Sequence, residues 1–204
     1  PISGYVMLGQ VSPVSSYSSH VFYYPVDEEN RAGATLRFRL PPGYLAVGPG
    51  ERLSDERDGR GLVQRWRSRD GLIKQLPYGW AVAKYARLEG RSRSGVPIRV
   101  FALPGQQARA KKVLKVAVDA IRFFERRFGP YPLKSVSIAE VKPQKGIAGV
   151  SLPGMVLLSA HFFHGASSYA RAKSIVASFR GPLVIVDALS HQYNFYAVSL
   201  PNAL

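Results

Sequence analysis

The sequence QARAKKVLKVAVDAIRFFERRF at Gln107–Phe128, followed directly by Gly129 and Pro130, decides how the chain is organised. Apolar residues recur in it every three to four positions, which predicts one apolar stripe along a helix. This stripe comprises Leu114, Val118, Ile121, Phe124 and Phe128. The basic residues on the remaining, solvated faces are Lys111, Lys112, Lys115, Arg122 and Arg126. A left-handed glycine and then a proline that cannot continue the helix predict its end at Phe128.

Short strand patterns precede this helix. Residues 35–40 alternate apolar and basic side chains, which predicts a half-buried strand with Leu36, Phe38 and Leu40 on one face. Similar stretches at 62–67, 80–85 and 97–101 are separated by Gly-rich or charged turns. Several short strands at this spacing are typical of an antiparallel sandwich or an open sheet.

The remaining segments divide into two groups. Residues 136–141 and 155–159 predict strands that are joined by a loop containing Pro and Gly. Residues 169–179 predict a helix that Gly181 and Pro182 interrupt, and Pro182 then begins a last helix, from Leu183 to about Val198. We therefore expect an α+β fold, in which a leader at 1–20 with little regular structure precedes a β-rich, sandwich-like domain at 21–104 and an α+β domain at 105–204.

Composition narrows the possible chemistry. The 204 residues are 46% hydrophobic, enough for one large domain or two small ones. The absence of cysteine excludes disulfides, thiolate zinc sites, iron–sulfur clusters and cysteine nucleophiles, and leaves the redox compartment open. No stretch approaches the roughly 18 apolar residues of a membrane span, and the start lacks the layout of a signal peptide. Because the chain begins with Pro1, we expect a processed or partial polypeptide.

Motif searches leave few catalytic possibilities. Asp187 is the single carboxylate after Glu140, so paired-carboxylate chemistry lacks its second acid there. The sequence contains no Gly-x-Ser-x-Gly elbow, Walker loop, dinucleotide-binding glycine motif or EF-hand run. We interpret His161 and His164, next to two phenylalanines, as part of a loop or strand end rather than as a metal site. The other histidines are His20 and His191.

One stretch has the frame of a zinc-binding helix. Residues 183–194 read LVIVDALSHQYN, in which Asp187 and His191 occupy the i, i+4 positions that carry both histidines of a His-Glu-x-x-His helix. This stretch resembles the active-site helix of the gluzincin metallo-aminopeptidases, the alanyl aminopeptidase and leukotriene hydrolase family. Residues 123–132, FFERRFGPYP, resemble the segment of that family in which a helix ends in Phe-Gly and Tyr-Pro ahead of a strand.

The resemblance extends over residues 97–198 and more loosely over 21–96. It implies a β-rich N-terminal domain followed by the first part of a thermolysin-like α+β domain, truncated at residue 204. In the family, zinc is the cofactor and peptide hydrolysis from the amino end is the activity.

The resemblance places catalytic roles on four positions, and only one family residue is retained. Asp187 stands at the first zinc histidine, Ala188 at the general-base glutamate, and His191 at the second zinc histidine. Ser151 stands at the glutamate that binds the substrate amino group. The third zinc ligand of the family falls beyond Leu204. A catalytic zinc needs three protein ligands and an open position, so we expect a pseudoenzyme that binds zinc only if ligands outside this sequence complete the site.

A simpler interpretation of the polar pair on this helix needs no metal. Asp187 and His191 lie four residues apart, so their side chains can share a hydrogen bond or an ion pair on one helix face.

The net charge of +15 indicates an anionic partner. Basic residues are dispersed, without a recognition helix, zinc finger or aromatic RNA-binding pattern, so we do not expect specific reading of nucleic acid. We expect an accessory or structural subunit that binds a large complex or an anionic membrane surface, at a peripheral-membrane or extracytoplasmic location rather than free in the cytoplasm. The alternatives are a fragment of a zinc-dependent aminopeptidase and a nonspecific binder of nucleic acid or anionic lipid. The candidate partner-binding residues are Arg65, Arg67, Arg69, Arg91 and Arg93.

Overall fold

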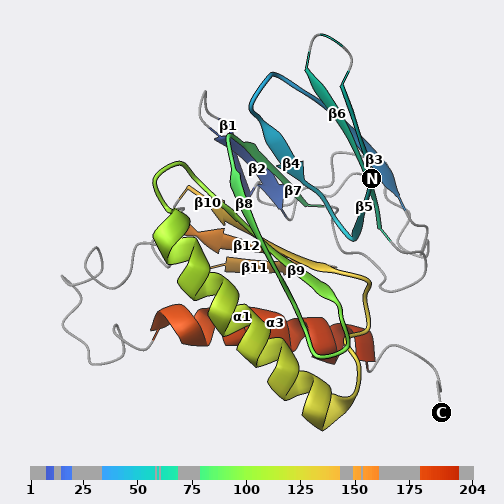
Figure 1. Cartoon of the computed structure of the whole chain (residues 1–204), viewed down its shortest axis with the longest axis vertical. Helices are drawn as coiled ribbons and strands as arrows, with labels where there is room; N and C mark the ends of the chain where they lie inside the picture. Colours follow the sequence, from blue (N-terminus) through green and yellow to red (C-terminus); the bar gives the residue numbers. More distant parts are fainter. Residues whose placement is uncertain are drawn as a thin grey trace, which may run out of the picture.

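The described part of the chain forms three layers, with two helices on one face of a central sheet and two smaller sheets on its other face (Figure 1). The structure is a computed structural model. It describes residues 8–11, 15–19, 34–57, 59, 61–68, 79–142, 149–152, 154–160 and 180–197.

The two smaller sheets are entirely antiparallel. One has the order β1-β2-β7-β4 and the other the order β3-β6-β5. Their strands are β1 Leu8–Val11, β2 Ser15–Ser19, β3 Thr35–Leu40, β4 Leu45–Val47, β5 Glu51–Arg57, β6 Leu62–Arg67 and β7 Trp80–Ala83. The predicted alternation in β3 is confirmed, since Leu36, Phe38 and Leu40 are the less exposed residues of that strand.

The prediction of little regular structure before residue 20 is wrong for the described part of that segment. β1 and β2 form an antiparallel hairpin, and β2 pairs with β7 through a register that sets Tyr17 opposite Ala81. Strand pairing uses main-chain hydrogen bonds, which a Ser-rich segment can make as well as an apolar one once a partner strand is present.

The central sheet contains both parallel and antiparallel pairs, in the order β11-β12-β10-β9-β8. β10 is parallel to β9 and to β12, whereas β8 and β11 are antiparallel edge strands. Its strands are β8 Ala86–Arg91, β9 Pro97–Ala102, β10 Val136–Val141, β11 Gly149–Leu152 and β12 Met155–Ser159. Every residue of β10 is buried because both faces of the sheet are covered.

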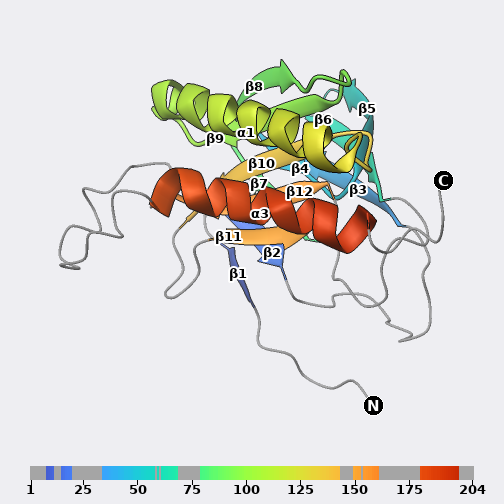
Figure 2. The same ribbon diagram turned by 90° about the horizontal axis from the view of Figure 1, so that it is seen from below.

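Two helices, α1 Gln107–Phe128 and α3 Arg180–Ala197, lie side by side on one face of the central sheet (Figures 1 and 2). Their apolar residues share a core with Ile98, Val100 and Ile138 from the strands. A second core lies on the opposite face, where Phe101 and Leu157 pack with Trp66 of the three-stranded sheet.

The predicted bounds of α1 are confirmed, and Gly129 beyond its end has a φ of 86°. The predicted buried stripe is only partly right. Ile121 and Phe124 are buried, but Leu114 and Val118 are partly exposed and Phe128 is 64% exposed. The other buried residues of α1 are Ala110, Val113, Ala117 and Ala120. Three of these four are alanines, whose small side chains let the helix backbone approach the sheet closely.

The predicted interruption at Gly181 and Pro182 is absent from α3, which runs through both residues from Arg180. Pro182 lies in the first helical turn, where backbone N–H groups have no acceptor within the helix, so a proline there costs no hydrogen bond. The helix predicted at 169–179 lies outside the described residues.

Besides β1 and β2, local patterns did not predict four strands, namely β4, β5, β8 and β11. The segment expected to be a loop at 149–154 contains β11, which pairs with β12 so that Ser151 lies opposite Val156. β8 and β9 belong to the same sheet as β10, so this sheet continues across the boundary expected after residue 104. The fold class is α+β, as predicted. Neither described helix is long and apolar enough to cross a membrane.

Candidate functional site

The positions that the resemblance marks as catalytic meet where α3 packs on β11. The hydroxyl of Ser151 donates a hydrogen bond of 2.9 Å to the carbonyl oxygen of Ala188. Ala188 is buried in the helix–sheet core and carries no group that can accept a proton. Two positions far apart in sequence are therefore in contact, and the contact is a structural hydrogen bond between a hydroxyl and the helix backbone.

Gln192 fixes this part of α3 to the β11–β12 hairpin. Its side chain is fully buried, and its Nε2 donates to Ser151 Oγ and, over 2.8 Å, to the carbonyl of Leu152. Its Oε1 accepts hydrogen bonds from the Gly154 N–H at 3.0 Å and from the Tyr131 hydroxyl at 3.2 Å. Sequence reasoning missed this residue. The available signal was its position on the same helix face as Ile185, Ala188 and Leu189.

Asp187 and His191 lie on a more exposed face of the same helix. Nε2 of His191 is 3.8 Å from Oδ1 of Asp187, and the side chains are 46% and 71% exposed. This distance allows an ion pair when the imidazole is protonated, as predicted from the i, i+4 spacing. An ion pair with this much solvent access contributes little to stability.

The residues present at these positions do not fit a catalytic zinc. Asp187 and His191 offer two metal ligands, whereas a catalytic zinc takes three protein ligands and keeps one open position. Within the described ranges, no group of three or more His, Asp or Glu side chains could hold a metal ion. His20, His161 and His164 lie outside the described residues.

An aromatic cluster anchors the end of α1 to α3. The ring centroid of Tyr193 lies 5.3 Å from that of Phe124, 5.6 Å from that of Tyr131 and 6.2 Å from that of Phe128. Burial, followed by the charge of Glu125, raises the pKa of the Tyr193 hydroxyl. Phe128 thus packs at the edge of this cluster rather than in the core.

A face of the three-stranded sheet is strongly basic. On β6, Arg65 and Arg67 are exposed, and on the neighbouring β3, Arg37 and Arg39 are exposed on the same face. The register places Arg37 directly opposite Arg65. We call these four residues the arginine face. The alternation in β3 predicted that Leu36, Phe38 and Leu40 share one face of a half-buried strand, but the pairing of its arginines with those of β6 needed the structure.

Neighbouring carboxylates on β5 offset only part of this charge. Glu56 lies 3.7 Å from Arg65, while Glu51 forms an ion pair of 3.2 Å with Lys134. Arg65 and Glu56 are both about half exposed, so this ion pair is weak.

The other candidate arginines are in different places. Arg91 is on β8, where it donates to the carbonyl of Gly95 over 2.9 Å and lies 3.8 Å from Glu89. Arg93 is in the turn after β8, and its backbone N–H donates to Glu125 over 2.9 Å. Arg69 lies outside the described residues. The structure therefore separates Arg65 and Arg67 from Arg91 and Arg93.

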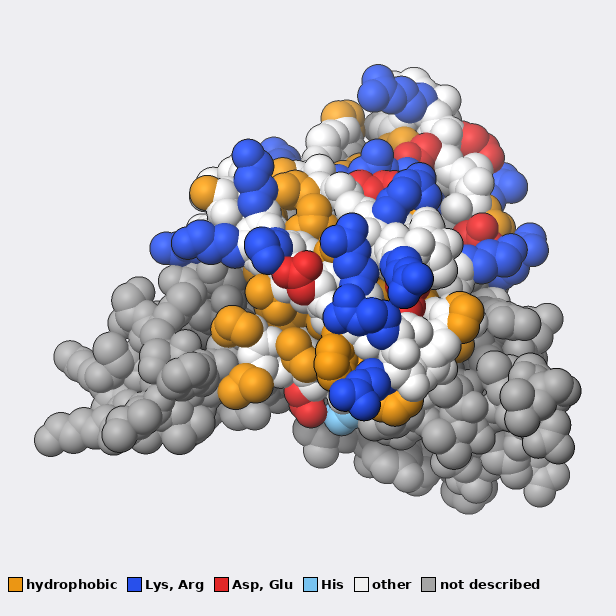
Figure 3. Space-filling model, turned by 60° about the horizontal axis from the view of Figure 1, so that its bottom comes forward, with side chains coloured by type: hydrophobic (Ala, Val, Ile, Leu, Met, Phe, Trp, Pro, Cys, Tyr) orange, Lys and Arg blue, Asp and Glu red, His pale blue; other side chains and the backbone are white. Residues whose placement is uncertain are grey.

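Lys and Arg side chains are spread over the face seen in Figure 3, with hydrophobic side chains gathered between them. The basic residues of α1 that were predicted to be solvated are all exposed. The arginine face differs from this general distribution because it concentrates arginines on paired strands.

Comparison of the chain with protein-family models finds no match, and comparison with curated proteins finds none.

Proposed function

We propose that this chain is a catalytically inactive, aminopeptidase-like module that serves as an accessory or structural subunit and binds an anionic partner through the arginine face. The proposal that the module is aminopeptidase-like rests on the resemblance to gluzincin aminopeptidases. A peripheral position at an acidic complex or membrane surface follows from the same charge.

The arginine face carries the binding part of the proposal. Like charges directly opposite each other on paired strands destabilise a sheet, and Arg37 lies opposite Arg65. An anionic surface that covers this face would relieve the repulsion and gain bidentate hydrogen bonds from guanidinium groups.

Chemistry at α3 and β11 supports the inactive part. Where the family has a general base, this chain has the buried methyl group of Ala188, and where the family binds the substrate amino group, Ser151 bonds to the helix. Gln192 adds buried hydrogen bonds to Ser151, Leu152 and Gly154 beside this contact. A zinc-bound water at this place would lack a proton acceptor.

Zinc content and turnover test the inactive part. We expect purified protein to contain far less than one zinc per chain and to hydrolyse none of a panel of aminoacyl reporter substrates. Near-stoichiometric zinc together with chelator-sensitive turnover would overturn this part and favour an aminopeptidase fragment.

Charge reversal tests the binding part. The double variant Arg65→Glu/Arg67→Glu should lose at least tenfold in affinity for the anionic partner recovered by co-purification, or for acidic vesicles, at physiological salt. The matched control Lys111→Glu/Lys112→Glu makes the same change in net charge on the exposed face of α1 and should bind as the parent protein does. Equal losses in both variants would mean that net charge, and not the arginine face, governs binding.

A further inference from the structure

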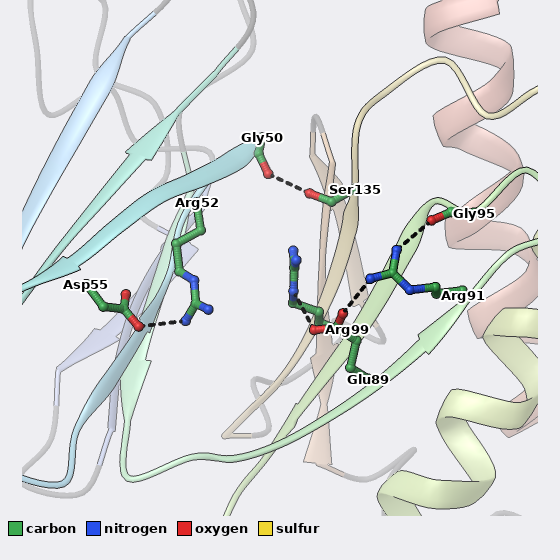
Figure 4. A network of polar contacts seen from close by, with 8 residues as sticks. All are labelled: Gly50, Arg52, Asp55, Glu89, Arg91, Gly95, Arg99 and Ser135. Atoms are coloured by element: carbon green, nitrogen blue, oxygen red, sulfur yellow. Dashed lines mark hydrogen bonds and ion pairs between the residues drawn. The ribbon is translucent and has the colours of Figure 1, made fainter.

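A second group of arginines lies between the three-stranded sheet and the β8–β9 hairpin, with Arg91 at its outer, exposed edge. Figure 4 shows Arg52 of β5, which reaches Asp55, on one side and Arg99 of β9, which reaches Glu89, on the other. The side chains of Arg52 and Arg99 are only 20% and 16% exposed. These two guanidinium groups are therefore largely withdrawn from water, unlike those of the arginine face.

A β-bulge places the first arginine. The register between β5 and β6 shifts between Arg52 and Ser54, so Arg52 pairs with Trp66 while Asp55 pairs with Gln64. Arg52 and Asp55 consequently lie on the same, inward face of β5 although they are three residues apart. Asp55 holds Arg52 over 3.0 Å and also accepts a hydrogen bond of 2.9 Å from the buried Gln64.

The β8–β9 register places the others. Arg87 pairs with Phe101, Glu89 with Arg99, and Arg91 with Pro97, so these side chains follow one face of the hairpin. Phe101 packs in the core with Trp66, which identifies this face as the one toward the three-stranded sheet.

Positive charge is in excess at this place. Among the described residues, the charged groups here are the guanidiniums of Arg52, Arg87 and Arg99 and the carboxylates of Asp55 and Glu89. Arg91 adds a fourth guanidinium at the outer edge, where it is 65% exposed and contacts Glu89 and the Gly95 carbonyl. Four positive and two negative charges leave an excess of two. Glu89 is already divided between Arg99 at 3.1 Å and Arg91 at 3.8 Å. Within the described residues, no other carboxylate forms an ion pair with any of the four arginines.

The charges act on one another. Burial lowers the pKa of Arg52, Asp55 opposes this effect, and the charges of Arg87 and Arg99 lower the pKa further. Partly buried charges of one sign are costly unless an opposite charge is supplied.

We propose that this cluster, formed by Arg52, Arg87, Arg91 and Arg99, is a binding site for a phosphate group in its dianionic form. The excess of two positive charges matches the charge of a phosphate monoester, and planar guanidiniums bind phosphate oxygens in bidentate pairs. The cluster is on the inward side of the three-stranded sheet and the arginine face is on its outward side. The phosphate site therefore goes beyond the anionic partner proposed above and does not depend on it.

Titration calorimetry with inorganic phosphate, at constant ionic strength set with chloride, tests the site. The parent protein should bind one phosphate saturably. Arg87→Gln removes an exposed guanidinium that forms no ion pair within the described residues, and should weaken binding at least tenfold without loss of fold. Arg52→Gln should weaken it at least as much, with far-ultraviolet circular dichroism as the check on folding.

Arg122→Gln is the matched control, because it removes one exposed arginine from α1, outside both the cluster and the arginine face. It should bind phosphate as the parent does. Absence of saturable binding in the parent, or equal binding by all the variants, would overturn the proposal.

Two further arms identify the source of the phosphate. A soluble phosphomonoester and vesicles containing phosphatidic acid present the same group free and on a lipid surface. Competition by either against inorganic phosphate supports the site and names its source, whereas competition by neither contradicts a site for phosphate monoesters.

Discussion

At the scale of single residues, the hydrogen bonds of Gln192 hold α3 in a fixed position on the β11–β12 hairpin. An amide that is buried and fully bonded cannot rearrange for a substrate without leaving donors and acceptors unpaired. The neighbouring His191 is half exposed and faces Asp187 instead. Adjacent residues of one helix thus have separate roles, one in the core and one at the surface.

Substitution of Gln192 tests this role. Gln192→Leu should lower the free energy of unfolding by about 3 kcal/mol, because the Gly154 N–H and the Leu152 carbonyl lose a buried partner. Urea unfolding measures the change. Ser190→Ala removes only an exposed hydrogen bond to the Asp187 carbonyl and should change stability by less than about 0.5 kcal/mol. Equal effects of the two substitutions would contradict the buried network.

Glu125 is a second residue with a defined electrostatic role. Burial works to raise the pKa of its carboxyl group, but hydrogen bonds from Ser94 and Ser92 and from the N–H groups of Ser94 and Arg93 together lower it. A lowered pKa in the folded state means that the charged carboxylate stabilises the fold above its unfolded pKa.

We therefore expect a pH-dependent effect of Glu125→Gln. The variant should be less stable than the parent at pH 7, and the difference should shrink as the pH falls below 4.5, the ordinary value for this group, and through the lower folded value. Urea unfolding between pH 3 and pH 7 measures this. A difference that stays constant across that range would show that the carboxylate charge is not involved.

At the scale of elements, Gly129 ends α1 in a conformation that other residues rarely adopt. Its φ of 86° and ψ of −175° lie in a region that is essentially restricted to glycine. Phe128 and Phe124 lie just before it in the aromatic cluster with Tyr193. The end of α1 therefore sets how the chain turns from the helix toward β10.

Gly129→Ala should lower the free energy of unfolding by about 1 to 3 kcal/mol, since alanine is strained at this backbone conformation. Thermal unfolding followed by circular dichroism measures the loss. Pro130→Ala, at the next and exposed position, requires no such conformation and serves as the control. An unchanged melting temperature for Gly129→Ala would mean that the turn relaxes without cost.

At the scale of the whole molecule, the central sheet joins the two cores. Contacts to the three-stranded sheet run from Ser135, whose hydroxyl donates to the Gly50 carbonyl over 3.2 Å (Figure 4), and from Lys134, which pairs with Glu51. The Tyr85 hydroxyl donates to the Glu140 carbonyl over 2.8 Å. Residues before and after position 104 therefore contribute to the same packed structure.

Fragments test this interdependence. A fragment of residues 105–204 lacks β9, which pairs with β10, and β8, which pairs with β9, and both strands pack against α1. This fragment should remain unfolded, which poor dispersion of its amide NMR signals would show. A fragment of residues 84–204 retains both strands and should be more protected against amide exchange. A folded 105–204 fragment would contradict this interdependence and support a domain boundary at residue 104.

Local signals made some elements predictable. The length of α1 follows from helical periodicity together with Gly129 and Pro130, which act within one turn of the helix end. The alternation in β3 and the apolar runs of β10 and β12 likewise depend only on neighbouring residues. Strands β4, β5, β8 and β11 carry weaker patterns, because their mixed composition is stabilised by pairing with distant strands.

The sequence by itself determined the α+β class, the bounds of α1 and the excess of basic residues, whereas the family roles of Asp187, Ala188 and Ser151 stay a prediction. Only the tertiary structure decided that Arg37 lies opposite Arg65, that the charge of Arg99 acts on Arg52, and that Gln192 bonds to the β11–β12 hairpin. The physical reason is the range of the interactions. Helix periodicity and caps act over a few residues, whereas strand register and side-chain clusters join residues that are tens of positions apart.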